Sequence, residues 1–135
     1  SGDDIRKIFR LKGYEYNDRV AILRKYSLFA KYITEQKINI ILAVVGMIEA
    51  PRKWNRINIE NYIEIYIKSS IKDIIKLDKK KIYNKKNPGK IIGIDIKPEY
   101  PKNPDISITN SFKGTTDQMA KNLIININKL LNEKN

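Results

Sequence analysis

The chain has 135 residues, of which 41% are hydrophobic and 31% are charged, and its formal net charge is +12. This length fits one domain with a packed core, and the positive charge indicates an anionic partner or only a soluble basic surface. The absence of cysteine and histidine excludes disulfides, thiolate metal sites, His-based triads and His-ligated metals. Any acid–base chemistry therefore falls to Asp, Glu, Lys or Tyr.

The sequence shows no sign of membrane insertion or export. Its apolar runs, such as Ile38–Val45, are too short to span a bilayer, and no secretory signal is visible. We therefore expect a cytoplasmic protein without a membrane partner. Ser1-Gly2 has the form of a cloning scar, which predicts that the natural chain begins upstream.

The first half of the chain predicts two longer helices separated by a strand. After a short helical start, Asn17-Asp18 forms an N-terminal cap, and apolar side chains recur at helical spacing through about residue 36. The β-branched run Ile38–Val45 predicts a parallel strand buried on both faces. Residues 51–60 follow as a second, basic helix.

The second half continues this alternation. Residues 62–67 alternate as a strand does, Ser69-Ser70 can cap a helix through about Leu77, and residues 105–109 make a short strand. Thr115–Gln118 is a capping-box pattern. It opens a last helix with a predicted buried stripe of Met119, Leu123, Ile127 and Leu130. Together these elements predict an α/β domain with a parallel sheet covered on both faces.

A basic loop of about residues 78–104 lies between the last two strands. It is rich in Lys, Pro, Gly and Asn, and so long a connection is usually a working loop or a mobile surface loop. Parallel sheets bind ligands at the carboxyl ends of their strands. In this chain those ends are 46–51, 68–70 and 109–114, so we interpret the loop as a lid over that edge.

Several separated stretches carry motifs in an order that resembles one kinase family. Residues 2–6, Gly-Asp-Asp-Ile-Arg, resemble Asp-Gly-Asp-x-x-Arg, and residues 13–19 resemble Gly-Phe-x-x-x-Asp-Arg. Residues 80–83 resemble Lys-Gly-Leu-Tyr, and the lid and its exit, residues 93–105, resemble Gly-Ile-Asp…Tyr-x-x-Pro-x-x-Pro-Asp. The ordered set resembles adenylylsulfate (APS) kinase, which phosphorylates the 3′-hydroxyl of adenylyl sulfate with ATP.

The resemblance implies a three-layer α/β/α P-loop NTPase-like domain over residues 1–135. The family's ATP-binding loop, Gly-x-x-x-x-Gly-Lys-Ser/Thr, does not occur in these residues, and neither does the strand that carries it. A sheet without its central strand would leave buried backbone groups unpaired, at about 1–3 kcal/mol each. We therefore expect a segment of about 35 residues, a typical βαβ length, upstream.

The resemblance also implies roles for individual residues, with ATP and Mg²⁺ as cofactors. Asp3 would be the catalytic carboxylate, accepting the proton of the substrate hydroxyl or orienting Mg²⁺. The implied substrate-binding residues are Arg6, Tyr14, Arg19, Ile22, Ala50, Pro51, Ile91 and Ile92. The implied lid and ATP-site residues are Lys80, Lys85, Lys90, Phe112, Lys113 and Gly114. Without the resemblance, the charged residues among them would read as ordinary surface side chains.

Three departures from the family pattern fall on the substrate side. The family's Asp-Arg-x-x-Asn has Ile22 for its Asn, its Ile-Ser-Pro has Ala50 for its Ser, and its Phe-Thr is Ile91-Ile92. One base-stacking aromatic and two polar groups are lost, which predicts a different substrate. The family includes a kinase of cytidine diphosphoramidate, used in making a bacterial capsule's phosphoramidate modification. Its smaller pyrimidine fits these changes, so we slightly prefer it to adenylyl sulfate.

Two other interpretations compete with a kinase of a small nucleotide substrate. A nucleic-acid-binding module needs basic residues on one face with interleaved aromatics, whereas the lysines here are spread and the tyrosines lie largely in apolar runs. We therefore expect no nucleic-acid partner. A non-catalytic remnant that binds nucleotide without a P-loop is the second alternative. The sequence leaves both a monomer and a homodimer open.

Overall fold

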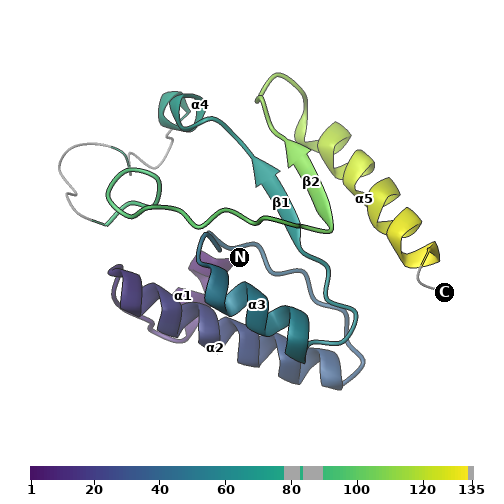
Figure 1. Ribbon diagram of the computed structural model, residues 1–135, viewed down its shortest axis with the longest axis horizontal. Helices are drawn as coiled ribbons and strands as arrows, with labels where there is room; N and C mark the ends of the chain where they lie inside the picture. The colour runs from purple at the N-terminus through teal and green to yellow at the C-terminus, as the bar shows by residue number, and fades with distance from the viewer. Residues whose placement is uncertain (78–82, 84–89, 134–135) are drawn as a thin grey trace. The chain divides into compact units, whose positions relative to one another are not determined.

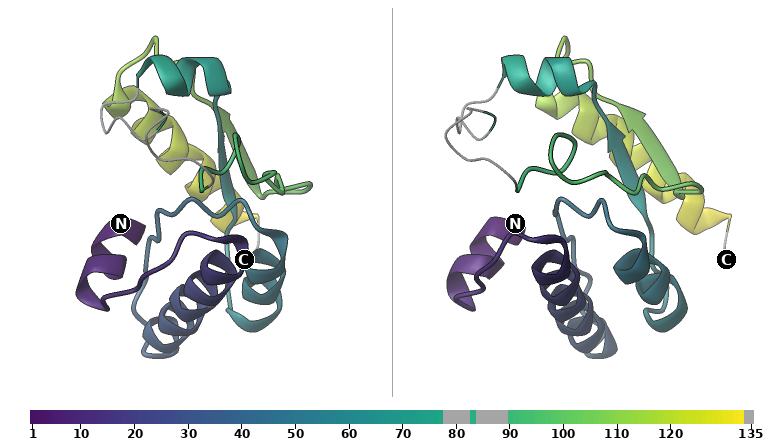
Figure 2. Two further views of the ribbon diagram at one scale, coloured as in Figure 1. Left: turned by 90° about the vertical axis from the view of Figure 1, so that its left-hand side faces the viewer. Right: turned by 60° about the vertical axis from the view of Figure 1, so that its left-hand side comes forward.

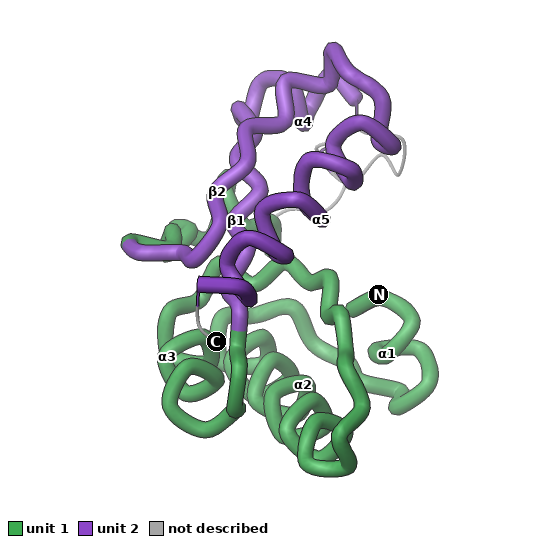
Figure 3. The backbone as a smooth tube through the Cα atoms, turned by 90° about the vertical axis from the view of Figure 1, so that its right-hand side faces the viewer, with its two compact units in different colours: residues 1–62, 84–102 green, residues 63–83, 103–135 purple. Residues whose placement is uncertain are grey.

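The computed structural model describes residues 1–77, 83 and 90–133 (Figure 1). The chain divides into two compact units, one formed by residues 1–62 and 84–102 and the other by residues 63–83 and 103–135 (Figure 3). The expectation that residues 1–135 form a single kinase-like domain stays a prediction.

Three helices build the first unit: α1 (Gly2–Ile8), α2 (Tyr16–Glu35) and α3 (Glu49–Asn58). Helix α2 begins two residues before the predicted start, because Glu15 is its N-cap and the Asp18 carboxylate accepts a hydrogen bond from the Glu15 amide at 3.2 Å. This reciprocal bond satisfies one of the amides that the first helical turn leaves without a partner.

Helices α2 and α3 pack side by side and form the core of this unit (Figure 2). Ile22, Tyr26 and Ala30 recur every four residues, which places them on one face of α2, and all three are buried. The Arg24 guanidinium also lies over the Trp54 ring, 3.8 Å from its centroid. Trp54 is therefore a packing residue between the two helices.

The strand predicted over Ile38–Val45 is wrong for the part of the chain that the structure describes, where this segment is neither helix nor strand and belongs to no sheet. It is not buried on both faces either, since Ile41 is 94% and Val45 63% exposed. A strand requires a hydrogen-bonded neighbour, and β-branched composition alone does not provide one. The segment is instead tied to the unit by its Ala43 carbonyl, which accepts the Gly2 amide at 2.9 Å.

The second unit contains a two-stranded parallel sheet of β1 (Ile65–Lys68) and β2 (Ile106–Thr109). Its register pairs Lys68 with Thr109, so the carboxyl ends of these two strands are adjacent, as predicted. Beyond them, the Ser69 hydroxyl donates to the Asn110 carbonyl at 3.1 Å. The α/β class and the parallel sheet are confirmed.

Two helices complete this unit: α4 (Ile71–Lys76) and α5 (Thr116–Asn132). Both predicted caps form, because the Ser70 hydroxyl accepts the Asp73 amide at 3.1 Å and the Thr115 hydroxyl accepts the Gln118 amide at 3.2 Å. Helix α5 packs on β2. Its predicted stripe is half-buried while the rest of the helix is exposed, and it consists of Met119, Leu123, Ile127 and Leu130.

Over the part of the chain that the structure describes, none of the helices combines the length and apolar character needed to cross a membrane.

Candidate functional site

The start of α1 is anchored from two sides. The Gly2 amide donates to the Ala43 carbonyl at 2.9 Å, and the Gly2 carbonyl accepts the Tyr26 hydroxyl at 2.7 Å. Tyr26 is only 4% exposed, and burial raises the pKa of its hydroxyl, so the group remains a proton donor at neutral pH. These contacts fix the helix turn that carries Asp3 and Arg6.

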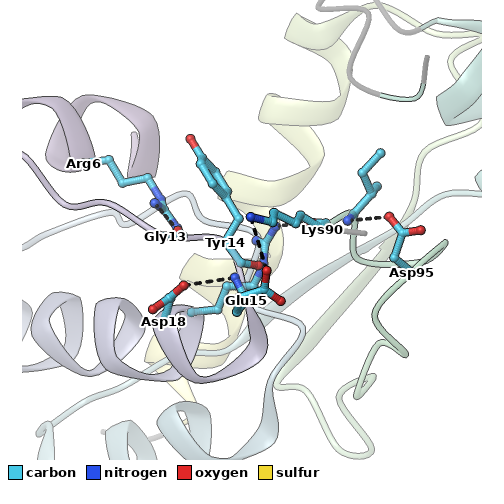
Figure 4. Close-up of polar contacts among 9 residues, drawn as sticks. Arg6, Gly13, Tyr14, Glu15, Asp18, Lys90 and Asp95 are labelled. Atoms are coloured by element: carbon cyan, nitrogen blue, oxygen red, sulfur yellow. Dashed lines mark hydrogen bonds and ion pairs between the residues drawn. The ribbon is translucent and has the colours of Figure 1, made fainter. Parts of the chain in front are cut away.

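Two arginines, Arg6 and Arg19, lie beside the ring of Tyr14, and Figure 4 shows Arg6 near Gly13 and Tyr14. The Arg6 guanidinium lies 4.5 Å from the ring centroid and that of Arg19 lies 5.7 Å from it. Each arginine also holds the loop backbone, since Arg6 donates to the Gly13 carbonyl at 2.9 Å and Arg19 to the Tyr14 carbonyl at 2.8 Å. The structure thus brings together three of the predicted substrate-binding residues, from two helices and the loop that joins them.

The charges of this cluster favour an anion. Desolvation lowers the pKa of Arg19, and the nearby positive charge of Arg6 lowers it further. Two guanidiniums held beside one ring repel each other, and a bound phosphate would relieve that repulsion. A guanidinium can also bind a phosphate through two parallel hydrogen bonds.

The loop between α1 and α2 requires a glycine at position 13, directly before Tyr14. Gly13 has a φ of +95°, and a Cβ atom added there would lie 2.3 Å from the Asp18 carboxyl carbon. No larger residue fits without moving Asp18, whose carboxylate caps α2. Gly13 therefore sets the direction in which Tyr14 leaves α1 and approaches the two arginines.

Residues 90–96 contact the same cluster. Arg19 donates to the Lys90 carbonyl at 2.7 Å, and the Lys90 ammonium lies 3.2 Å from the Glu15 carboxylate (Figure 4). A tight turn follows, in which Gly93 has a φ of +93° and the Asp95 carboxylate accepts the Ile91 amide at 2.9 Å. The Gly-Ile-Asp motif of the lid thus forms a compact loop, and the predicted lid residue Lys90 is paired with the acid that caps α2.

The remaining predicted substrate-binding residues belong to the same unit, but the structure buries some of them. Ile22 is 5% exposed in the core against α3, and Pro51 is buried in α3 itself. Ala50 is exposed on α3, and Ile91 and Ile92 are half-buried in the turn described above. Their roles toward a substrate stay predictions.

The residues assigned to ATP are divided between the two units, with Lys90 in the first unit and Phe112, Lys113 and Gly114 in the second. Phe112, Lys113 and Gly114 form an exposed loop of the second unit between β2 and α5, where the Phe112 amide donates to the Asn110 side chain at 2.9 Å. Lys80 and Lys85 lie outside the described residues.

Glu99 is a contact residue that the sequence did not indicate. One of its carboxylate oxygens accepts the Tyr16 hydroxyl at 2.8 Å and the other accepts the Glu49 amide at 2.6 Å. Arg52 donates to the Glu99 carbonyl at 2.8 Å. An open pocket of about 460 Å³ lies beside this cluster, lined by Tyr16, Glu49, Lys97, Glu99, Tyr100 and Lys102. The one sequence signal that could have indicated Glu99 is its position directly before the Tyr100-Pro101 motif.

The described residues hold no cluster of three or more Asp and Glu side chains that could form a metal cage. Mg²⁺ in phosphoryl-transfer enzymes commonly uses one or two carboxylates together with phosphate oxygens, so it does not need such a cluster. Asp3, an exposed carboxylate one helical turn before Arg6, is compatible with that arrangement.

Comparison with known proteins supports one family. A model of adenylylsulphate kinase matches residues 1–109. Cytidine diphosphoramidate kinase from Campylobacter jejuni is 29% identical over 126 residues, covering 91% of this chain and 74% of that protein. Adenylyl-sulfate kinase from Pseudomonas aeruginosa is 33% identical over 129 residues, covering 91% of this chain and 65% of the relative, so the chain spans just under two thirds of that enzyme.

A solved structure has the same fold. The Mycobacterium tuberculosis APS kinase CysC, in complex with AMPPNP and APS, superposes with a TM-score of 0.80 at 24% identity, covering 94% of this chain and 77% of that chain. At this identity the likeness shows the fold alone, which is that of a P-loop kinase. Because the family match extends over most of the sequence, the chain belongs to the adenylylsulphate kinase family.

Proposed function

We propose that the whole protein is an ATP-dependent kinase that transfers the γ-phosphate to the 3′-hydroxyl of a nucleotide, with cytidine 5′-diphosphoramidate as the preferred acceptor. The observation that carries this proposal is the convergence of Arg6 and Arg19 on Tyr14. An aromatic ring offers a stacking surface for a base, and the guanidiniums beside it offer hydrogen bonds to the phosphates. We propose that the reaction takes place in the cytoplasm, where ATP is available as the phosphate donor.

Asp3 is the proposed catalytic carboxylate. It lies three residues before Arg6 on α1, which places both side chains on the same face of the helix. As the acceptor's 3′-oxygen forms its bond to the γ-phosphorus, the hydroxyl proton passes to the Asp3 carboxylate and ADP leaves. When bound, Mg²⁺ would neutralise charge on the transferring phosphate, and ligation of this ion is the alternative role for the Asp3 carboxylate. The 135 residues contain no Gly-x-x-x-x-Gly-Lys-Ser/Thr motif, and the proposal concerns the whole protein.

Two substitutions support the preferred acceptor. Where the family pattern has an asparagine, Ile22 is buried in the core and offers no polar group. Where the pattern has a serine, Ala50 offers no hydroxyl. Contacts that would hydrogen-bond adenylyl sulfate are thereby lost, at about 1–3 kcal/mol each. The chain is similar both to the Campylobacter jejuni cytidine diphosphoramidate kinase and to the Pseudomonas aeruginosa adenylyl-sulfate kinase, so these similarities are compatible with either acceptor.

The test is ADP release by the complete natural protein with ATP and Mg²⁺, measured separately on cytidine diphosphoramidate and on adenylyl sulfate. We expect the larger kcat/KM on the cytidine compound. A larger value on adenylyl sulfate overturns the acceptor preference and leaves the kinase proposal standing. No ADP release with either acceptor overturns the kinase proposal and favours a nucleotide-binding remnant.

The role of Asp3 has its own test. Asp3→Asn keeps the size of the side chain but removes its basicity, so kcat should fall at least about a hundredfold. Asp117→Asn, which alters an exposed first-turn aspartate of α5, is the matched control and should keep the wild-type kcat. A near-normal kcat in Asp3→Asn would remove this residue from the proton transfer.

A further inference from the structure

Glu99 connects residues 90–99 to three other parts of the first unit through hydrogen bonds. Its carboxylate accepts one hydrogen bond from the Tyr16 hydroxyl and one from the Glu49 amide, at 2.8 and 2.6 Å. Its own amide donates to the Met47 carbonyl at 3.0 Å, and its carbonyl accepts from Arg52 at 2.8 Å. One residue therefore ties its segment to α2, to α3 and to the chain that precedes α3.

The contact with α3 replaces a missing cap. Helix α3 begins at Glu49 without a side-chain cap of its own, because Ile48 is its N-cap residue. An N-terminal turn needs acceptors for its free amides and favours a nearby negative charge. Glu99 supplies both from 50 residues away. In agreement, both hydrogen bonds lower the pKa of Glu99, and the bond from the Glu49 amide has a larger effect than the bond from Tyr16.

The contact with α2 lies next to the arginine–tyrosine cluster. Tyr16 is the first residue of α2, and Arg19 lies three residues later on the same side of the helix. Arg19 and Glu15 in turn contact Lys90 through its carbonyl and its ammonium. The segment 90–99 therefore contacts the first turn of α2 through its first residue, Lys90, and through its last residue, Glu99.

We infer that Glu99 is a positioning residue, which holds residues 90–99 against the first turn of α2 so that Arg19 and Tyr14 stay aligned for the nucleotide. This inference rests on the proposed function for its ligand, and on the contacts above for the coupling itself. Glu99 acts through Tyr16 and α3 and has no role in the chemical step. Its loss should therefore weaken binding of the acceptor and leave phosphoryl transfer from a saturated enzyme almost intact.

Three variants of the complete natural protein separate the two bonds. Glu99→Ala removes both, and Tyr16→Phe removes only the bond to α2. Glu99→Gln keeps an acceptor oxygen for the Glu49 amide and places an NH₂ group that can donate to the Tyr16 oxygen, so it should restore much of the function. Glu60→Ala, which alters an exposed glutamate just after α3, is the matched control.

Amide hydrogen exchange tests the coupling without any assumption about the reaction. In Glu99→Ala, the amides of Arg19 and of residues 91–96 should exchange at least several-fold faster, and in Glu60→Ala they should keep the wild-type rate. Faster exchange confined to Glu49 and Glu99 would show that the bonds are only local, and would overturn the inference. This readout also decides the coupling if the wild-type protein phosphorylates neither acceptor, in which case the proposed function fails separately.

Kinetics test the positioning role. Losing two hydrogen bonds should raise the acceptor KM of Glu99→Ala about tenfold, with the KM for ATP and kcat close to wild type. Tyr16→Phe should show a smaller rise, and Glu99→Gln the smallest. Two outcomes would overturn the positioning role. One is an unchanged acceptor KM in Glu99→Ala. The other is an equal weakening of the binding of the acceptor and of ATP that follows a lower Tm of the variant.

Discussion

Tyr14 and the two arginines beside it form the surface that we propose binds the nucleotide. Arg6 and Arg19 stack beside its ring, and each uses part of its guanidinium to hold a backbone carbonyl of the same loop. Their rotamers are therefore restricted before any ligand binds, which lowers the entropy cost of binding. Lysine has no planar fork and could not hold a carbonyl and stack on the ring with one group.

Arg19→Lys should therefore weaken binding of the acceptor, although the substitution conserves the charge. We expect the acceptor KM to rise about 10- to 100-fold, as for the loss of a charge-assisted hydrogen bond of about 1.5–3 kcal/mol. Steady-state kinetics on the complete natural protein measure this value. Lys25→Ala, which removes an exposed positive charge from the same helix, should leave the KM unchanged. A wild-type KM in Arg19→Lys would show that only net charge matters at this position.

Gly13→Ala should destabilise the first unit. Alanine at a φ of +95° is strained, and its Cβ would lie 2.3 Å from the Asp18 carboxyl carbon. The strain alone corresponds to about 1–2 kcal/mol, measurable as a lower urea midpoint. Gly114→Ala is the matched control, because a Cβ there meets no atom within 4 Å. Equal midpoints for the two variants would mean that the loop at Gly13 adapts without cost.

The residues of this cluster could be predicted, whereas their supports could not. Arg6, Tyr14 and Arg19 lie in short motifs whose order along the chain resembles the family's. Glu99 is different, because its partners Tyr16 and Glu49 are 83 and 50 residues away. No local pattern encodes such contacts, since they arise only when separate segments fold together.

The same distinction between local and tertiary information holds for whole elements. Ser70 and Thr115 cap α4 and α5 as predicted, because a cap is decided within one helical turn. The stripe of α5 also follows from its spacing, and the register of β1 with β2 places their carboxyl ends together. The failed prediction is Ile38–Val45, which has the composition of a strand but no partner strand among the described residues.

The attachment of residues 96–102 to α2 and α3 should depend on pH at both extremes. Hydrogen bonds from the Glu49 amide and Tyr16 lower the pKa of Glu99, so its stabilising contribution is present above about 4.3, the ordinary glutamate value, and is lost as pH falls through the lowered pKa. The bond to Glu99 raises the pKa of Tyr16, so that contribution is present below about 10 and is lost as pH rises through the raised pKa.

Comparing the Tm of the wild type with that of Glu99→Gln tests the acid limb. The difference should be constant between about pH 6 and 8 and should shrink below about pH 4, where the wild-type carboxylate is protonated and the amide of the variant does not titrate. The positive charge of Arg52 also lowers the pKa of Glu99, and both proteins retain Arg52. A Tm difference that persists undiminished at pH 3 would show that charge on Glu99 contributes nothing.

At the scale of the whole molecule, the net charge of +12 is large for a protein whose proposed ligand is a small nucleotide. Nucleotide binding at Arg6 and Arg19 involves few charges, so log Kd should change with log salt by a slope of only about 1–2. Binding of a single-stranded nucleic acid releases about 0.7 counterion for each phosphate that the protein contacts, which gives a much steeper slope.

We therefore predict weak, purely electrostatic binding of a random single-stranded DNA of about 20 nucleotides to the complete natural protein. Fluorescence anisotropy between about 50 and 200 mM salt measures it, and the affinity should fall by about a hundredfold or more if six or more phosphates are contacted. The affinity for cytidine diphosphate, measured by calorimetry over the same range, should fall only about 4- to 16-fold. Arg19→Ala should abolish the nucleotide binding and leave the DNA binding almost unchanged, because it removes one of 27 basic residues. Submicromolar DNA binding that survives about 200 mM salt would instead identify a nucleic-acid-binding protein.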